Sequence, residues 1–263
     1  MTTDFDPSTF TARLGALSRS ADRLSGVVGG LDPAALEAQS YDTEWSVAQV
    51  LSHLGSAGVI FRHGLDVALG AKDADEGFAQ ATWDEWNAKS PTAMAADCLA
   101  VDRALLDRLG SLTDSERATV KLPLGPVELD LAGMAGMRLN EHALHTWDVE
   151  VSFDPTVTVP ADTVPLVVDN LALITSFVAQ PTGTEHTVRI ETSDPGRRFV
   201  LDIGLERASL TPAEGADAAG AADIELPAEA LVRLVYGRLD PDHTPAVTGA
   251  EHLDELRRVF PGF

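Results

Sequence analysis

The sequence is poor in cysteine and in basic residues. Its 263 residues include a single cysteine, Cys98, and 19 basic side chains stand against 41 acidic ones, which gives a formal net charge of −22. One cysteine excludes an internal disulfide framework and any CxxC metal or redox motif. The shortage of positive charge argues against nucleic acids and anionic membrane surfaces as partners, because both are recognised through clustered lysine and arginine.

Long hydrophobic runs and a targeting segment are also lacking. The most apolar stretch, residues 164–179, is interrupted by a proline, an aspartate and an asparagine, and it falls short of the ~20 apolar residues that cross a bilayer. The start of the chain, Met1–Pro7, lacks the basic residues and apolar run of a signal peptide. Because 44% of the residues are hydrophobic, the chain can still bury a core. We therefore expect a soluble, cytoplasmic protein, either a monomer or a homodimer.

The spacing of the apolar residues changes near residue 182. Before it, apolar residues recur at helical spacing, which predicts helices over about 10–28, 43–69, 92–109, 130–151 and 161–178, the second of them capped by Asp42 or Thr43. After it the hydrophobic period becomes two, which predicts strands over 187–192, 199–203, 208–211 and 222–226 and helices over about 227–236 and 251–259. The expected fold class is α plus α+β, with an antiparallel helical bundle in residues 1–182 and a small α+β domain in residues 183–263.

The segment from Arg138 to Asp148 carries the most informative pattern. Glu141 and His145 are four residues apart, so on a helix they share one face, and Arg138 and Asp148 lie on the same stripe. A carboxylate and an imidazole placed in this way can ligate one divalent cation, although a solvated ion pair has the same spacing. His142 is rotated by about 100° from Glu141, and we expect it at the boundary of the bundle, outside such a site.

His53 is the third candidate ligand. It lies on an otherwise apolar helix, near the line of Val50 and Ala57, and is therefore expected to point toward neighbouring helices. A lone histidine there can also be a satisfied core residue. Joined with Glu141 and His145, it completes a His/Glu/His set, which is the composition of a catalytic zinc site with an open position.

These elements resemble a known superfamily. The Trp45-Ser-Val…His53 element and the Glu-x-x-x-His-x-x-Asp helix are similar to DinB/YfiT-like metal-binding four-helix bundles, specifically to the amino-terminal domain of actinobacterial mycothiol-dependent maleylpyruvate isomerases. The later segments 236–240, 248–249 and 259–262 are similar to that family's sterol-carrier-like carboxy-terminal domain. The resemblance implies that His53, Glu141 and His145 are zinc ligands.

The resemblance also implies an activity. In the isomerases, mycothiol thiolate adds to the cis double bond of maleylpyruvate, the resulting single bond rotates, and elimination gives the trans isomer. For this chain it implies an isomerase or S-transferase that uses Zn²⁺ or another divalent cation, with mycothiol as thiol cosubstrate, on a small anionic electrophile. Such chemistry needs no cysteine from the protein, and Cys98, in an apolar helix, is expected in the core.

An anionic substrate requires local positive charge in so acidic a protein. Arg138, one turn before Glu141, is one candidate, and its alternative role is a salt bridge within the bundle. Arg238 matches an arginine that projects toward the active site in the family, with Tyr236 beside it as a candidate cofactor-binding residue; the alternative for Arg238 is a cation at a helix C-terminus. Residues 64–102 contain no arginine, whereas the isomerases use one there. We therefore expect an electrophile other than maleylpyruvate.

Two other classes of function fit the same residues. A non-catalytic module that binds a hydrophobic or thiol ligand and uses the metal structurally would need a fourth ligand, and the sequence offers no obvious one. A regulatory zinc-bundle protein of the anti-sigma kind would favour cysteine among the ligands, and the candidate set contains none.

Overall fold

The computed structural model describes residues 5–125, 127–215 and 220–262. The chain forms two compact units, Met1–Val157 and Thr158–Phe263. No helix in the described ranges is long and apolar enough to span a membrane.

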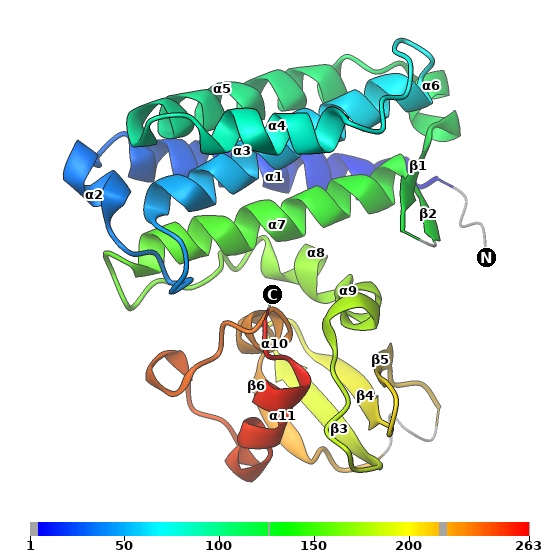
Figure 1. The fold of residues 1–263 in the computed structure, drawn as a ribbon. Coiled ribbons are helices and arrows are strands. Elements are labelled where there is room, and N and C mark those ends of the chain that lie inside the picture. Colours follow the sequence, from blue (N-terminus) through cyan, green and yellow to red (C-terminus); the bar gives the residue numbers. More distant parts are fainter. Residues whose placement is uncertain (1–4, 126, 216–219, 263) are drawn as a thin grey trace. The chain divides into compact units, whose positions relative to one another are not determined.

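The first unit is built on four long helices among the described residues. They are α1 (Pro7–Val28), α3 (Val47–Ala68), α5 (Pro91–Gly110) and α7 (Leu131–Val151) (Figure 1). Helix α1 packs mainly against α7, and α3 packs mainly against α5. The shorter elements are α2 (Pro33–Glu37), α4 (Phe78–Asn87), α6 (Asp114–Thr119) and an antiparallel hairpin of β1 (Lys121–Leu124) and β2 (Val127–Asp130). The predicted helical bundle is confirmed.

Helix α3, which carries His53, begins later than the sequence pattern predicts. Its N-cap is Ser46, whose hydroxyl accepts a hydrogen bond from the Gln49 amide, while the Gln49 side chain accepts one from the Ser46 amide. This reciprocal capping box fixes the start of the helix at Val47. Asp42 lies instead in the preceding turn, where its carbonyl accepts a hydrogen bond from the Gln39 side chain. Trp45 therefore precedes the helix.

The interior of the first unit is apolar around α3 and α5. Leu51, Leu54, Ala95 and Cys98 are buried in one hydrophobic cluster. Cys98 is fully buried, as expected, and burial raises the pKa of its thiol well above the usual range. A thiol in this environment stays protonated, so it packs as a small apolar side chain.

The second unit contains a four-stranded sheet in the order β5-β4-β3-β6. Its strands are β3 (His186–Ser193), β4 (Arg197–Ile203), β5 (Ala208–Pro212) and β6 (Ile224–Pro227), and its helices are α8 (Val164–Val168), α9 (Leu171–Val178), α10 (Ala228–Val235) and α11 (Leu253–Val259) (Figure 1). Strand β3 pairs antiparallel with β4 and parallel with β6. The predicted strands and the α+β class are confirmed.

The division between the units lies earlier than the predicted boundary at residues 182 and 183. The expected helix over 161–178 is broken into α8 and α9, with Asp169 and Asn170 between them. Helix α8 packs on α10, and α9 packs on β5. Both therefore belong to the sheet unit, and the boundary falls between Val157 and Thr158. Hydrophobic period reveals that a helix has an apolar face, but not which partner covers that face.

Candidate metal centre

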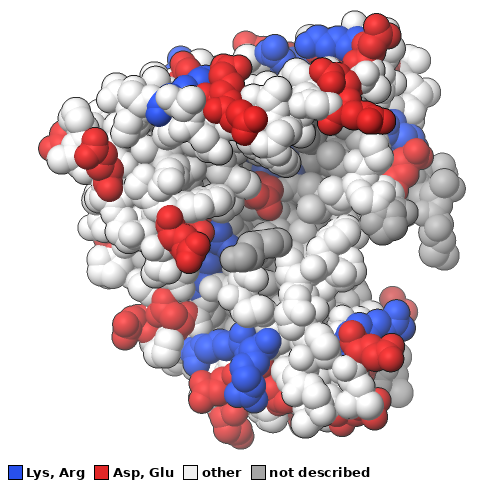
Figure 2. Space-filling model, in the orientation of Figure 1, with Lys and Arg blue, Asp and Glu red and all other residues white. Residues whose placement is uncertain are grey.

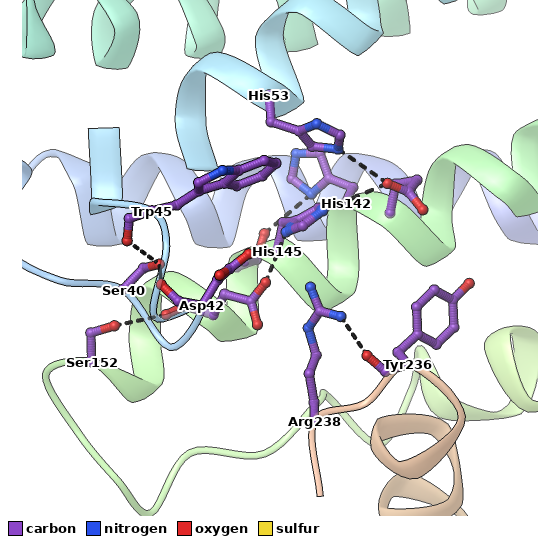
Figure 3. Close-up of polar contacts among 12 residues, drawn as sticks. Ser40, Asp42, Trp45, His53, His142, His145, Ser152, Tyr236 and Arg238 are labelled. Carbon is purple, nitrogen blue, oxygen red and sulfur yellow. Dashed lines mark hydrogen bonds and ion pairs between the residues drawn. The ribbon is translucent and has the colours of Figure 1, made fainter. Parts of the chain in front are cut away.

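His53, Glu141 and His145 come together in the first unit. The two histidines are labelled in Figure 3. One carboxylate oxygen, Glu141 Oε2, lies 3.3 Å from His53 Nε2 and 3.6 Å from His145 Nε2. The candidate ligand atoms of the three residues all lie within 4.8 Å of one another. Glu141 and His145 share a face of α7 because of their spacing, whereas His53 is brought to them from α3.

The three side chains differ in their exposure to solvent. His53 and Glu141 are 33% and 34% exposed, and His145 is 11% exposed. The constellation therefore lies at an accessible surface of the first unit, where a small ion or molecule can reach it.

Asp148 orients His145 from behind. The Asp148 carboxylate is fully buried, and its Oδ2 lies 2.8 Å from His145 Nδ1. Because an ionised carboxylate can only accept, the proton of His145 is assigned to Nδ1, which leaves the lone pair on Nε2 directed at Glu141. A carboxylate behind a histidine is the usual arrangement at metal-ligating histidines, where it fixes the tautomer and raises the basicity of the ligand.

The electrostatics of the site keep Glu141 ionised. Desolvation by the surrounding protein opposes ionisation of this carboxyl, but its close contacts with the imidazoles of His145 and His53 outweigh that effect and lower the pKa of Glu141 below its usual range. A carboxylate that stays charged is ready to bind a cation without first losing a proton.

Trp45 covers one side of the histidine pair. Its ring centroid lies 5.2 Å from that of His53 and 6.3 Å from that of His145, and it is stacked on the latter at an interplanar angle of 28°. The two imidazoles themselves meet edge to face at 4.7 Å. The indole restricts the orientation of both rings and shields one flank of the site from water.

The donor set fits a divalent transition metal. Two imidazole nitrogens and one carboxylate oxygen form a His₂Glu set, which is typical of catalytic zinc sites that keep a further coordination position open. In the part of the chain that the structure describes, the group contains these three protein donors.

Comparison with known proteins agrees with this fold. Residues 17–150 match the family model described as the mycothiol maleylpyruvate isomerase N-terminal domain. The chain belongs to this family. Two solved structures, of a mycothiol-dependent maleylpyruvate isomerase and of a mutant of that enzyme, have the same fold, with TM-scores of 0.62 at 14% and 13% identity, covering 90% of this chain and 92% of theirs. A search of curated proteins returns no significant match.

His142 was predicted at the boundary of the bundle. The structure shows it fully buried instead. Its Nε2 lies 3.0 Å from Asp102 Oδ2, and its Nδ1 lies 2.8 Å from the Ser20 hydroxyl. The period of α7 correctly separated His142 from the face that carries Glu141 and His145. It could not show that a carboxylate from α5 and a hydroxyl from α1 make full burial of an imidazole tolerable.

Arg138 lies in the same buried cluster. Its side chain is 3% exposed and its Nη2 donates to Asp102 Oδ1 at 3.0 Å. This is the salt bridge that was the alternative to a substrate-binding role. Burial of Asp102 opposes its ionisation, but His142 and Arg138 together outweigh it and lower the pKa of the carboxyl.

Arg238 and Tyr236 lie in the second unit, directly after α10. Arg238 Nη1 donates to the Tyr236 carbonyl at 2.8 Å (Figure 3), a contact with the C-terminal end of the helix. Both side chains are buried, at 8% and 2% exposure. Gly237 between them has φ +71°, and a Cβ there would lie 2.3 Å from the Gly262 Cα. Only glycine allows this sharp turn without strain and without a clash.

Acidic and basic side chains are mixed on the face shown in Figure 2, and neither forms a single dominant patch. Figure 2 shows Asp and Glu side chains scattered over this face, in keeping with the net charge of −22. Long-range attraction therefore cannot collect an anionic substrate, and specific cationic contacts are required.

Proposed function

We propose that this protein is a zinc-dependent enzyme that uses a low-molecular-weight thiol to act on a small anionic electrophile. Mycothiol is the first candidate for this thiol. The observation that carries the proposal is the meeting of His53, Glu141 and His145 within 4.8 Å at an accessible surface. Membership of the mycothiol maleylpyruvate isomerase N-terminal domain family supports the choice of thiol.

The chain's own residues prepare such a site in three ways. His53 and His145 both direct Nε2 toward Glu141, and Asp148 holds the proton of His145 on Nδ1. Glu141 contributes the one negative charge among the three donors, so a divalent cation bound by them keeps a net positive charge. A bound zinc ion would supply deprotonation of a coordinated thiol at neutral pH.

Arg238 is the proposed contact for a carboxylate of the substrate, with Tyr236 beside it contributing to thiol binding. An arginine presents a planar fork of donors that matches a carboxylate, and Arg238, a residue that is only 8% exposed, is weakly screened. Arg138 is not given this role, because its guanidinium is engaged by Asp102 inside the bundle.

The charges in residues 64–102 support an electrophile different from maleylpyruvate. The two basic residues there, Lys72 and Lys89, are each paired with carboxylates: Lys72 with Asp66 at 3.9 Å, and Lys89 with Asp97 at 2.9 Å and Glu85 at 3.5 Å. This segment therefore offers no unengaged cation that replaces the arginine expected there.

Calorimetry and turnover test the proposal. Zinc-loaded protein should bind mycothiol, and metal-free protein should not. Turnover with thiol far below the substrate concentration would identify an isomerase, which regenerates the thiol, whereas one thiol consumed per product would identify an S-transferase. Absence of thiol binding to zinc-loaded protein would end the proposal.

Substitution of the proposed carboxylate contact gives a second test. Arg238→Ala should lower kcat/KM by about 10²–10³, the effect of losing one charge-assisted contact to developing or fixed negative charge. Its zinc content should equal that of the wild type. Unchanged kcat/KM would show that Arg238 does not contact the substrate.

A further inference from the structure

The first unit holds a second polar cluster, buried beside the metal centre. We propose that Arg138 and Asp102 form a tether that positions the His53 segment of α3 against α7 and thereby sets the affinity of the metal centre. This inference rests on the proposed function, because it assigns the tether a role toward that metal.

The tether is made by one nitrogen atom. Arg138 Nη2 donates to the Leu54 carbonyl of α3 and to Asp102 Oδ1 of α5, both at 3.0 Å. Leu54 follows His53 directly in the chain, and Arg138 lies one turn before Glu141 on α7. The same guanidinium thus holds α3 next to one ligand and α7 next to another. Asp102 is 4% exposed, so these bonds are shielded from competing water.

Gly58 makes room for this contact. A Cβ at Gly58 would lie 2.7 Å from Val101 Cγ1 and 3.3 Å from Arg138 Nη2. The missing side chain lets α3 approach α5 and lets the guanidinium reach the helix carbonyl. A carbonyl oxygen has two lone pairs, so Leu54 can accept this bond in addition to a helical one.

The metal centre needs such a device because of how its ligands are distributed. Glu141 and His145 share α7, and their separation is fixed by helix geometry. His53 comes from α3, which packs mainly against α5, while α7 packs mainly against α1. Ligand distances at a metal must hold to about 0.2 Å. The packing of the main helix pairs does not itself set the distance from His53 to Glu141.

The remainder of the cluster is structural and not a second catalytic site. Ser20, His142 and Asp102 are linked in the order found in hydrolase triads, at 2.8 and 3.0 Å. Ser20 is only 6% exposed and His142 is fully buried, so no substrate can reach the hydroxyl. The cluster therefore acts by connecting helices, and Arg138 is a positioning residue in it.

The experiment compares metal affinity in variants that keep the fold but differ at the tether. In the double variant Arg138→Met with Asp102→Asn, the charges are removed together, so neither is left buried and alone, and the amide oxygen can still accept from His142 Nε2. Ser20→Ala is the matched control, because it breaks the far end of the same cluster and leaves the Leu54 contact intact. Zinc affinity is measured by chelator competition on folded protein, and the cobalt(II) visible spectrum reports coordination geometry.

We expect the double variant to bind zinc about 10–100-fold more weakly, with an altered cobalt spectrum, the size of effect seen when groups that orient ligands are lost. Ser20→Ala should keep wild-type affinity and spectrum. Should the double variant not fold, Arg138→Lys serves in its place, since it retains the charge but its shorter side chain does not place a nitrogen where Nη2 lies.

Three results would overturn the inference. The first is wild-type zinc affinity and spectrum in the tether variants. The second is an equal loss in Ser20→Ala, which would indicate general loosening of the bundle. The third is a wild-type protein that binds no metal; that result contradicts the proposed function itself, whereas the first two leave it standing.

Discussion

Helix α7 carries two histidines three residues apart that end in opposite situations. His145 is held from behind by Asp148 and turns its second nitrogen toward Glu141 and His53 at an accessible surface. His142 is fully buried, and both of its nitrogens already face partners, Asp102 and Ser20.

The difference shows what makes a histidine available as a ligand. Both side chains have a carboxylate on one ring nitrogen, so that contact alone does not distinguish them. The other nitrogen decides: in His145 it converges with two further donors, and in His142 it is occupied by a hydroxyl. In the open cluster, formed by His53, Glu141 and His145, the candidate donor atoms face one another. In the buried cluster, formed by Ser20, Asp102, Arg138 and His142, both ring nitrogens of the histidine already face partners.

The largest expected effect is the loss of metal from the open cluster. His145→Ala should lower zinc affinity by on the order of 10³, since three or four ligands share a total binding free energy of about 10–16 kcal/mol. Elemental analysis after dialysis checks this. His142→Ala should keep one zinc per chain while lowering the free energy of unfolding by about 1–3 kcal/mol. Stoichiometric zinc in His145→Ala would mean that the assigned ligand set is wrong.

Breaking the buried cluster should instead reduce stability. Asp102→Ala leaves Arg138 charged and unpaired inside the bundle, and it should lower the free energy of unfolding by about 3–5 kcal/mol. Asp97→Ala, on the same helix, removes a 49%-exposed partner of Lys89 and should cost at most about 1 kcal/mol. Urea denaturation measures both, and equal losses would contradict the distinction between buried and exposed pairs.

A smaller effect on zinc affinity is expected from Asp148, which lies behind His145. Asp148→Asn keeps the shape of the side chain but replaces the carboxylate with a neutral amide, which is a weaker acceptor for the proton on His145 Nδ1, and zinc affinity should fall by about 10–100-fold. Glu150→Gln, a matched carboxylate-to-amide change that breaks the pair with Arg23, should leave zinc affinity unchanged. Chelator competition compares the two, and an equal response would show that Asp148 does not act through His145.

The smallest effect is a pH dependence in the buried cluster. Because the pKa of Asp102 is lowered in the folded protein, its carboxylate contributes stability that is fully present above the unfolded value near 3.8 and is lost as the pH falls toward the folded value. The stability difference between wild type and Asp102→Asn should therefore be constant near neutral pH and narrow below about pH 4. Urea titrations from pH 7 to pH 3 measure this difference, and one that widened with acid would contradict the assignment.

Much of the fold follows from local pattern. The long helices and the strands were predictable because apolar periods of 3.6 and 2 record which face of each element is buried. The Glu141–His145 pair was predictable for the same reason, since helix geometry alone places positions four apart on one face. A signal for Asp148 was also present, because it lies three residues after His145 on the same stripe, but its role as an orienting group was not assigned.

Other features were decided only by tertiary structure. That His53 meets Glu141, 88 residues away, depends on how α3 is held against α7. The pairing of Arg138 with Asp102, the burial of His142, and the membership of α8 and α9 in the sheet unit are equally non-local. The physical reason is common to all of them. A hydrophobic period predicts that a face will be covered, and a charged residue on such a face requires a compensating partner. That partner comes from a distant segment, and only tertiary packing selects it.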